Sequence, residues 1–304
     1  MSTSLLRTAI LTVSLALAGA AAHAGTFQQQ IPADPRGEVD VSNISGRIVI
    51  TGWDQSAVSV TADLPGGSQR VKLTGGHGRI NVCVTYSNSD SCNSPGWSGE
   101  HTSVRLEVHV PRGSELDVSG VSADIMSRGV TGGQRLHTVS GDIDAELGSG
   151  DDEVGSVSGA VELHGSGQDG TLRVTSVSGD LTITKAAGEL EARTVNGRVS
   201  AEVASARTVR LNTTSGGIDL GASLASGGTI EAETVSGDQK FRVSAPSGYS
   251  YEVRTFSGDI HDCFGQQPDK SEYGPGSRLN GTRGGGSGHI RIKSLSGDVS
   301  LCDH

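Results

Sequence analysis

Aromatic residues and proline are scarce in this sequence: Phe, Trp and Tyr make up 3% of its 304 residues, and only 8 residues are proline. The shortage of proline excludes a collagen-like chain, which also needs glycine at every third position. Glycine is abundant, with 45 copies, and Val, Ile and Thr recur between the glycines in short alternating runs. Such runs exclude a disordered chain, and the spread of Gly and β-formers excludes a packed helical protein. The composition therefore predicts an all-β fold.

The sequence also lacks an apolar run long enough to cross a membrane. The run at residues 9–18 has about ten residues, where a spanning helix needs roughly 20. It follows Arg7 and precedes small residues ending in Ala22-His23-Ala24, which is the pattern of a secretory signal peptide with an A-x-A-like cleavage site. We predict that residues 1–24 are a signal peptide, that no transmembrane segment remains after its cleavage, and that the chain is exported to the periplasm, the cell surface or the medium.

An excess of positive charge is missing as well. The formal net charge is −10, from 24 Lys and Arg against 34 Asp and Glu. An acidic chain gains nothing from phosphate attraction and is repelled by anionic lipid surfaces, so nucleic acid is excluded as a partner. The sequence does not identify the partner, which we expect to be an envelope protein or a surface ligand.

One motif, of the form Thr/Ser-Val-Ser-Gly-Asp-Ile, is repeated along the C-terminal part of the chain. Its glycine stands at Gly141, Gly159, Gly179, Gly197, Gly216, Gly237, Gly258 and Gly297. Up to Gly258 the copies are about 19 residues apart, a period too short for a propeller blade and without the pattern of a leucine-rich repeat. The period fits one turn, or rung, of a single-stranded parallel β-solenoid (β-helix), in which short strands stack rung on rung.

Apolar residues stand two positions before, two after and four after the motif glycine. Around Gly179 these are Val177, Leu181 and Ile183. Positions two apart share one face of a strand, so we expect all three columns to line a narrow aliphatic interior. The glycine is expected at a corner between strands, where positive φ favours it. A β-branched residue should therefore destabilise the fold far more at Gly179 than at Gly285.

The N-terminal third follows the same plan less regularly. Residues 43–48 contain the motif as Asn-Ile-Ser-Gly-Arg-Ile, residues 52–54 are Gly-Trp-Asp, and residues 108–113 are Val-His-Val-Pro-Arg-Gly. No linker divides the chain, so residues 25–304 are predicted to form one domain. Together with the Val-Ser-Gly-Asp-Ile repeats, these motifs resemble the DUF4097 family of adhesin-like β-strand-repeat proteins of the bacterial envelope. The resemblance implies a β-solenoid with no established catalytic activity, and it supplies no catalytic motif to transfer.

Four cysteines in an exported chain suggest two disulfides, for which three pairings are possible. Cys263 and Cys302 each stand five residues after a motif glycine, so in adjacent rungs their Cα atoms would be about 4.8 Å apart, within reach of a disulfide. Adjacency requires the Gly-rich residues 266–288 to form a loop. We predict a Cys263–Cys302 bridge that pins an exposed C-terminal rung, and a Cys83–Cys92 bridge that closes a hairpin.

The aspartate after the motif glycine is the one repeated side chain that could carry chemistry. In adjacent rungs Asp238, Asp259 and Asp298 would form a stack of carboxylates, which either holds a cation such as Ca²⁺ or caps the turns. Other residues, such as Ala160 and Arg198, interrupt the column. A motif present in nearly every rung is usually a device of the fold, so we predict turn capping, with no catalytic residue, no metal site and no cofactor.

Two classes of function fit these observations. The favoured one is a non-catalytic, exported β-solenoid of the cell envelope that acts as an interaction or adhesin-like scaffold. The alternative is a polysaccharide lyase or hydrolase, because β-helices also host such enzymes. An enzyme of that kind usually offers aromatic platforms to the sugar, and Trp53 and Trp97 are the only tryptophans. We therefore predict that the protein is not an enzyme.

Overall fold

The chain is all-β in the computed structural model, which describes residues 25–65, 69–76, 78–86, 92, 103–270 and 275–303. The signal peptide predicted for residues 1–24 and the side chain of Trp97 lie outside the described residues. No helix that could cross a membrane is found in the described part of the chain.

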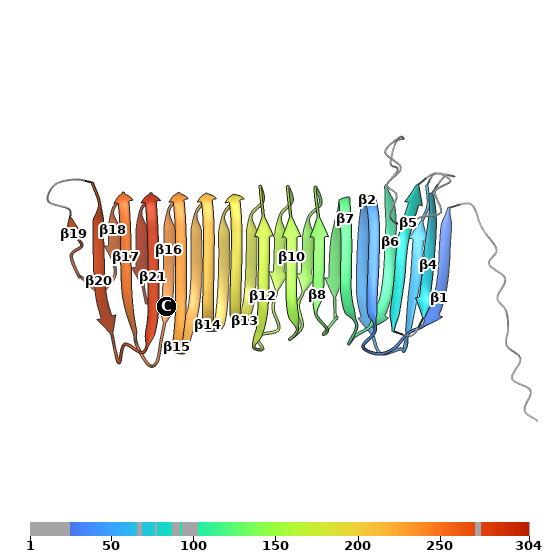
Figure 1. Ribbon diagram of the computed structural model, residues 1–304, viewed down its shortest axis with the longest axis horizontal. Coiled ribbons are helices and arrows are strands. Elements are labelled where there is room, and N and C mark those ends of the chain that lie inside the picture. Colours follow the sequence, from blue (N-terminus) through green and yellow to red (C-terminus); the bar gives the residue numbers. More distant parts are fainter. Residues whose placement is uncertain are drawn as a thin grey trace, which may run out of the picture.

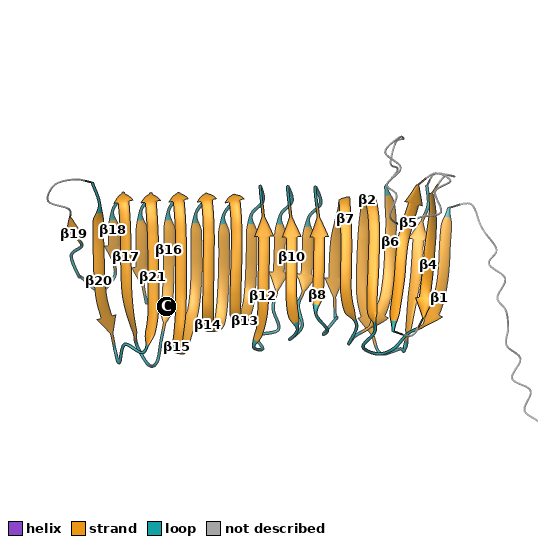
Figure 2. Cartoon of the chain, in the orientation of Figure 1, coloured by secondary structure: helices purple, strands orange, loops and turns teal. Residues whose placement is uncertain are grey.

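The described residues form 22 strands with short connections, as Figure 2 shows. The strands are β1 (Thr26–Pro32), β2 (Glu38–Trp53), β3 (Ala57–Asp63), β4 (Gln69–Gly76), β5 (Arg79–Tyr86), β6 (Val104–Pro111), β7 (Glu115–Arg128), β8 (Gln134–Thr138), β9 (Ile143–Glu146), β10 (Asp151–Ser156), β11 (Val161–His164), β12 (Gly170–Ser176), β13 (Leu181–Asn196), β14 (Val199–Ser215), β15 (Ile218–Ser236), β16 (Gln239–Ser244), β17 (Tyr249–Ser257), β18 (Ile260–Asp262), β19 (Asp269–Lys270), β20 (Ser277–Arg283), β21 (Gly288–Ser296) and β22 (Val299–Cys302).

Each central repeat forms two strands joined at the motif glycine, and we call this unit a rung. The strands before the glycine pair in parallel with one another, as β8, β10 and β12 do, and make a first layer. The strands after the glycine, such as β9, β11 and the start of β13, pair in parallel and make a second layer. Figure 1 shows the resulting row of stacked strands.

The core lies between the two layers and consists of aliphatic columns. Residues two and four positions after the motif glycines are buried, as predicted, except Asp262, which follows Gly258 and is half-buried; Leu181 and Leu163, for example, are fully inaccessible. The parallel register places Val161, Leu181 and Val199 side by side in successive rungs. Such a column buries apolar surface along the whole stack without needing large side chains, which accounts for the few aromatic residues.

Both ends of the stack depart from the predicted parallel arrangement. At the N-terminal end β1 pairs antiparallel with β3, β3 with β6, and β4 with β5. At the other end β20 pairs antiparallel with β17 and β19 with β20. The prediction of one parallel stack over residues 25–304 is therefore wrong at the ends. Antiparallel strands cover both layers at the N-terminal end and the first layer at the other end, which limits edge-to-edge association there.

The C-terminal rung, made of β21 and β22, lies between two earlier rungs. Strand β21 pairs on one side with β15 and on the other with β17, so that Ile290 lies between Ile230 and Tyr251. Strand β22 lies in the same way between β16 and β18. In Figure 1 the C-terminus accordingly lies within the row of strands. The prediction of an exposed C-terminal rung is wrong, because the chain turns back and inserts its last strands into the stack.

Alternation of charge gives a physical reason for this order. Outward side chains of the first layer form a column in which opposite charges follow one another across neighbouring strands. The column consists of Asp117, Arg135, Glu153, Arg173, Glu191, Arg210, Glu231, Arg291 and Glu252. Inserted between Glu231 and Glu252, Arg291 separates two carboxylates that would lie side by side if the rungs stacked in sequence order. Like charges directly opposite each other destabilise a sheet.

Two disulfides are present, Cys83–Cys92 with a Cα–Cα distance of 5.8 Å and Cys263–Cys302 with one of 4.9 Å. The second bridge joins the inserted rung to its outer neighbour. The connection between these rungs, residues 266–288, is not only a loop as we expected: it contains β19 and β20, and its residues 271–274 lie outside the described residues.

Candidate functional site

Every exposed large hydrophobic residue in the described part of the chain belongs to a single column. The column stands two positions before the motif glycine, or before Ala123 at the equivalent place in β7, and its members are between 41% and 54% exposed. They are Val121, Val139, Val157, Val177, Val195, Val235, Leu295 and Phe256, in the order of the stack, with Thr214 between Val195 and Val235. We call this column the apolar ridge. The prediction that these residues line the interior is wrong.

The ridge points outward because a hydroxyl takes the adjacent inward position. Buried Thr138 precedes Val139; its Oγ1 accepts a hydrogen bond from the Gly141 amide at 3.2 Å and donates one to the Ala123 carbonyl at 3.1 Å. Ser156 Oγ accepts the equivalent bond from the Gly159 amide at 2.9 Å. These bonds satisfy backbone groups at a corner that buries them, so the hydroxyl faces inward and the valine beside it faces solvent.

The motif glycines lie at the corners, but most of them are required for a reason other than the predicted positive φ. Of the eight, only Gly237, Gly258 and Gly297 have positive φ. At Gly159 an added Cβ would lie 1.8 Å from the Gly141 carbonyl oxygen, and at Gly179 it would lie 2.0 Å from that of Gly159. Each corner thus rests directly on the backbone of its neighbour, and a side chain there would separate the rungs.

Two shallow hollows lie beside the C-terminal half of the apolar ridge and share Lys293 and Ser294. The first, of about 620 Å³, includes Val195, Val235 and Leu295 in its lining. The second, of about 520 Å³, lies around Phe256. Its lining also contains Arg254, Lys270, Arg278 and Lys293. The ridge therefore borders a group of basic side chains, with Asp269 and Glu233 among them, at this end of an otherwise acidic protein.

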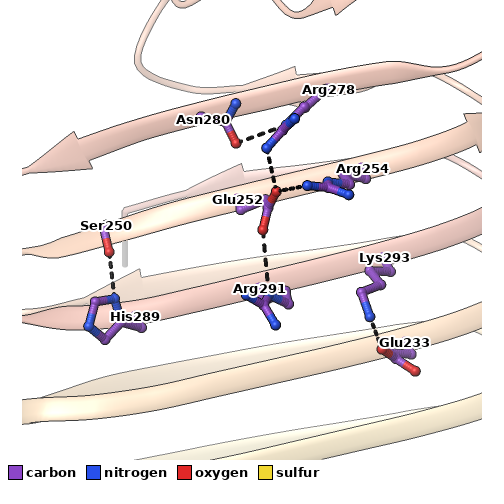
Figure 3. A network of polar contacts seen from close by, with 9 residues as sticks. All are labelled: Glu233, Ser250, Glu252, Arg254, Arg278, Asn280, His289, Arg291 and Lys293. Atoms are coloured by element: carbon purple, nitrogen blue, oxygen red, sulfur yellow. Dashed lines mark hydrogen bonds and ion pairs between the residues drawn. The ribbon is translucent and has the colours of Figure 1, made fainter.

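Carboxylates hold Arg254, Arg278 and Lys293 in place, as Figure 3 shows. Glu252 bonds to Arg254, lies 2.8 Å from the Arg278 guanidinium and lies 3.5 Å from Arg291 Nε. Burial raises the pKa of Glu252, but the hydrogen bond and charge of Arg254, with the charges of Arg278 and Arg291, outweigh it and lower the pKa below its usual value. Three arginines fixed by one carboxylate make a rigid surface. The sequence alone does not reveal this network, because its members lie on three different strands.

The aspartates after the motif glycines cap the next rung. Asp142 Oδ1 accepts a hydrogen bond from the Ala160 amide at 2.8 Å, and Asp180 Oδ1 accepts one from the Arg198 amide at the same distance. The stack of Asp238, Asp298 and Asp259 repeats this contact at 3.0 and 2.8 Å. The carboxylates thus have a structural role at the corners, and the described residues contain no group of three or more His, Cys, Asp or Glu that could hold a metal ion.

Asp152, the second residue of β10, is a buried carboxyl. Only 6% of it is exposed, and its register partner in the next rung is Leu172. Its Oδ1 accepts a hydrogen bond from the backbone amide of Gln134 at 2.9 Å. Burial raises the pKa of Asp152 to about 7; the charge of Asp151 adds to the shift and the Gln134 hydrogen bond opposes it.

Replacing Asp152 by asparagine should change how stability depends on pH. A carboxyl whose pKa is higher in the folded chain binds more protons folded than unfolded, so the free energy of unfolding falls as pH rises from about 4 to about 7. We expect Asp152→Asn to remove this fall and to be more stable than the wild type at pH 8 by roughly 2–4 kcal/mol. Urea unfolding at pH 5 and pH 8 measures the effect. The exposed neighbour provides the control: Asp151→Asn should keep the fall, and an unchanged slope in Asp152→Asn contradicts the assignment.

The family model Toastrack DUF4097 matches residues 38–302. The chain therefore belongs to this family, and the resemblance seen in the sequence is confirmed. No curated protein matches the chain.

Several solved structures are similar to the chain over most of its length. A "putative lipid binding protein" from Parabacteroides distasonis is 11% identical and has a TM-score of 0.41, with 92% of this chain and 97% of that chain covered. A "putative adhesin" from Bacteroides fragilis is 11% identical with a TM-score of 0.33, covering 93% and 98%. A "putative cell adhesion protein" from Clostridium sporogenes is 10% identical with a TM-score of 0.26, covering 92% and 100%. Similarities this distant assign no function to the chain.

Proposed function

We propose that the protein is an exported, non-catalytic scaffold of the cell envelope, built as a continuous parallel β-solenoid between its antiparallel ends, and that the apolar ridge is its interaction surface. One observation carries the proposal: all exposed large hydrophobic residues of the described chain fall on one line. Apolar side chains scattered over a surface need no explanation, whereas a contiguous exposed row is typical of an interaction site. The two disulfides support export, because such bonds persist in oxidising compartments.

The fold suits this role because it gives the ridge a rigid backing. Some of the hydroxyls behind the ridge, such as those of Thr138 and Ser156, are bonded to the corners, and aspartates beside it bond to neighbouring rungs. A preorganised surface loses little conformational entropy when it binds.

Three valine-to-threonine changes test the ridge as an interaction surface. Val157→Thr, Val177→Thr and Val195→Thr together keep side-chain shape and β-propensity but remove apolar contact. We expect the triple variant to lose most binding to envelope preparations of the parent bacterium. Conservative changes in a second-layer column, Glu162→Gln, Thr182→Ser and Ser200→Thr, provide the control and should keep it. Equal binding by both variants contradicts the proposal.

The non-catalytic part of the proposal has its own test. Incubation of the protein with a panel of anionic polysaccharides should release no shorter products. Cleavage that a single substitution abolishes would establish the enzyme alternative instead.

A further inference from the structure

We propose that the occupant of the apolar ridge is the ridge of a second copy of this chain, so that the protein associates through its own repeats. This inference rests on the proposed function, in which the ridge is an interaction surface. The spacing of the ridge, the charge around it and its size support this inference.

The ridge is a straight row with a fixed period. It crosses nine neighbouring strands of the first layer from Val121 to Phe256. Backbone hydrogen bonds join successive members of the ridge: the Ser158 amide donates to the Val139 carbonyl, and the Ser178 amide donates to the Val157 carbonyl. Neighbouring strands are about 4.8 Å apart, so the ridge is roughly 38 Å long and presents a side chain every 4.8 Å or so.

The spacing of the ridge side chains limits which kind of partner can pack against the whole ridge. Side chains at a constant spacing interdigitate over many repeats only with a surface of the same spacing. A helix repeats every ~5.4 Å, and over eight intervals it drifts from the ridge by about one full interval. A single extended strand places a side chain on one face every ~6.7 Å and drifts faster. Another stack of strands keeps register over the whole length, and a second copy of this chain is such a stack.

The charges around the ridge permit two copies to meet. On the corner side the ridge is flanked by uncharged residues such as Ser140, Ser158 and Ser178. On the other side, the N-terminal half of the ridge also has uncharged or weakly basic neighbours. Next to Val139, Val157 and Val177 stand His137, Gly155 and Thr175. A partner can therefore cover this half without burying a carboxylate, lysine or arginine. The charged column beyond them alternates in sign and is paired within itself, as in Arg173–Glu191 at 3.1 Å. This half of the face therefore carries little net charge although the chain as a whole is acidic. The other half is flanked by Arg193, Glu233, Lys293 and Arg254, of which Glu233 and Lys293 pair with each other.

The size of the ridge predicts a weak association. A strip roughly 38 Å long and about 10 Å wide covers roughly 400 Å² on each copy, or about 800 Å² in total. Contacts of that size are transient, so the dimer should form with a dissociation constant in the micromolar range or above. A two-fold arrangement, in which the same surface is used by both copies, is the usual form of such a contact.

Sedimentation velocity over a range of protein concentration tests the inference on the purified, disulfide-bonded chain. The weight-average mass of the wild type should rise from monomer towards dimer as concentration increases. The triple variant Val157→Thr, Val177→Thr and Val195→Thr should need at least about tenfold more protein to reach the same mass, while the second-layer control behaves as wild type. Far-UV circular dichroism and melting temperature establish that both variants are folded.

Two outcomes overturn the inference: a wild type that remains monomeric at every concentration, or a wild type and a ridge variant that associate equally. Neither outcome decides the proposed function. If the chain is monomeric but the ridge variant still loses binding to the envelope, the ridge is an interaction surface for a different partner. If the ridge variant loses self-association and keeps envelope binding, the ridge serves self-association alone.

Discussion

Replacing Gly179 by alanine should destabilise the fold by roughly 3 kcal/mol or more, or prevent folding altogether. The single added carbon would lie 2.0 Å from the Gly159 carbonyl oxygen and 2.9 Å from its carbonyl carbon. Because both atoms belong to the backbone of the neighbouring rung, no side-chain rotation relieves the contact. The corner would have to move away from the stack, and the hydrogen bonds beside it would lengthen. Thermal and urea unfolding measure the loss.

Gly76 is the matched control for this change. An added Cβ there meets nothing within 4 Å, and the residue does not have positive φ. We expect Gly76→Ala to change stability by no more than about 0.5 kcal/mol. Gly285, which the sequence suggested as the insensitive position, is less suitable, because a Cβ there would lie 2.9 Å from the Ser247 carbonyl oxygen. Equal melting temperatures for Gly179→Ala and Gly76→Ala would show that the corners do not need glycine.

Removing the Cys263–Cys302 disulfide should release the inserted rung. The bridge spans 39 residues, and closing a loop of that length in the unfolded chain is worth roughly 4 kcal/mol in the chain-entropy model. We expect the double variant Cys263→Ser/Cys302→Ser to lose about 2–4 kcal/mol. The loss should be local at first, so hydrogen exchange should speed up in β21, β22 and β18 before it does in β8 to β12.

The other disulfide is the control for this experiment. Cys83–Cys92 spans 9 residues, for which the same model gives roughly 2.5 kcal/mol, and it lies at the opposite end of the stack. Cys83→Ser/Cys92→Ser should leave exchange in β21 unchanged. Protection of β21 that survives loss of Cys263–Cys302 would mean that pairing with β15 and β17 holds the rung without the bridge.

The sequence was sufficient to predict the repeat, the corner position of its glycines and two of the three apolar columns. These features follow from a motif that is repeated many times, so the structure inferred for one copy is supported by the same pattern in the others. The prediction that the third column, two positions before the motif glycine, is buried was wrong for a local reason. Counting in twos from Leu181 back to Val177 assumes an unbroken strand, but the corner at Gly179 interrupts the alternation, and the buried position passes to Ser176.

The order of the rungs could not be predicted from the period, because a repeat specifies how rungs stack and not which rung lies next to which. The charges hold more information on this point. Glu231, Glu252 and Arg291 occupy the same place in their rungs, and their signs alternate only when Arg291 lies in the middle. The burial of Asp152 could not be predicted either. Aspartate close to glycine is typical of an exposed turn, and what buries Asp152 is the neighbouring rungs, which the local sequence does not describe.

The inserted C-terminal rung has a consequence for how the protein is made. A chain that emerges N-terminus first can lay down its rungs in order as far as β16. The next rung to emerge, β17 with β18, has its place two positions further along, and the place between stays vacant until residues 288–302 arrive. This part of the fold therefore cannot be completed until residues 288–302 have been made, and any chain cut short before β21 lacks the strands that join these two rungs.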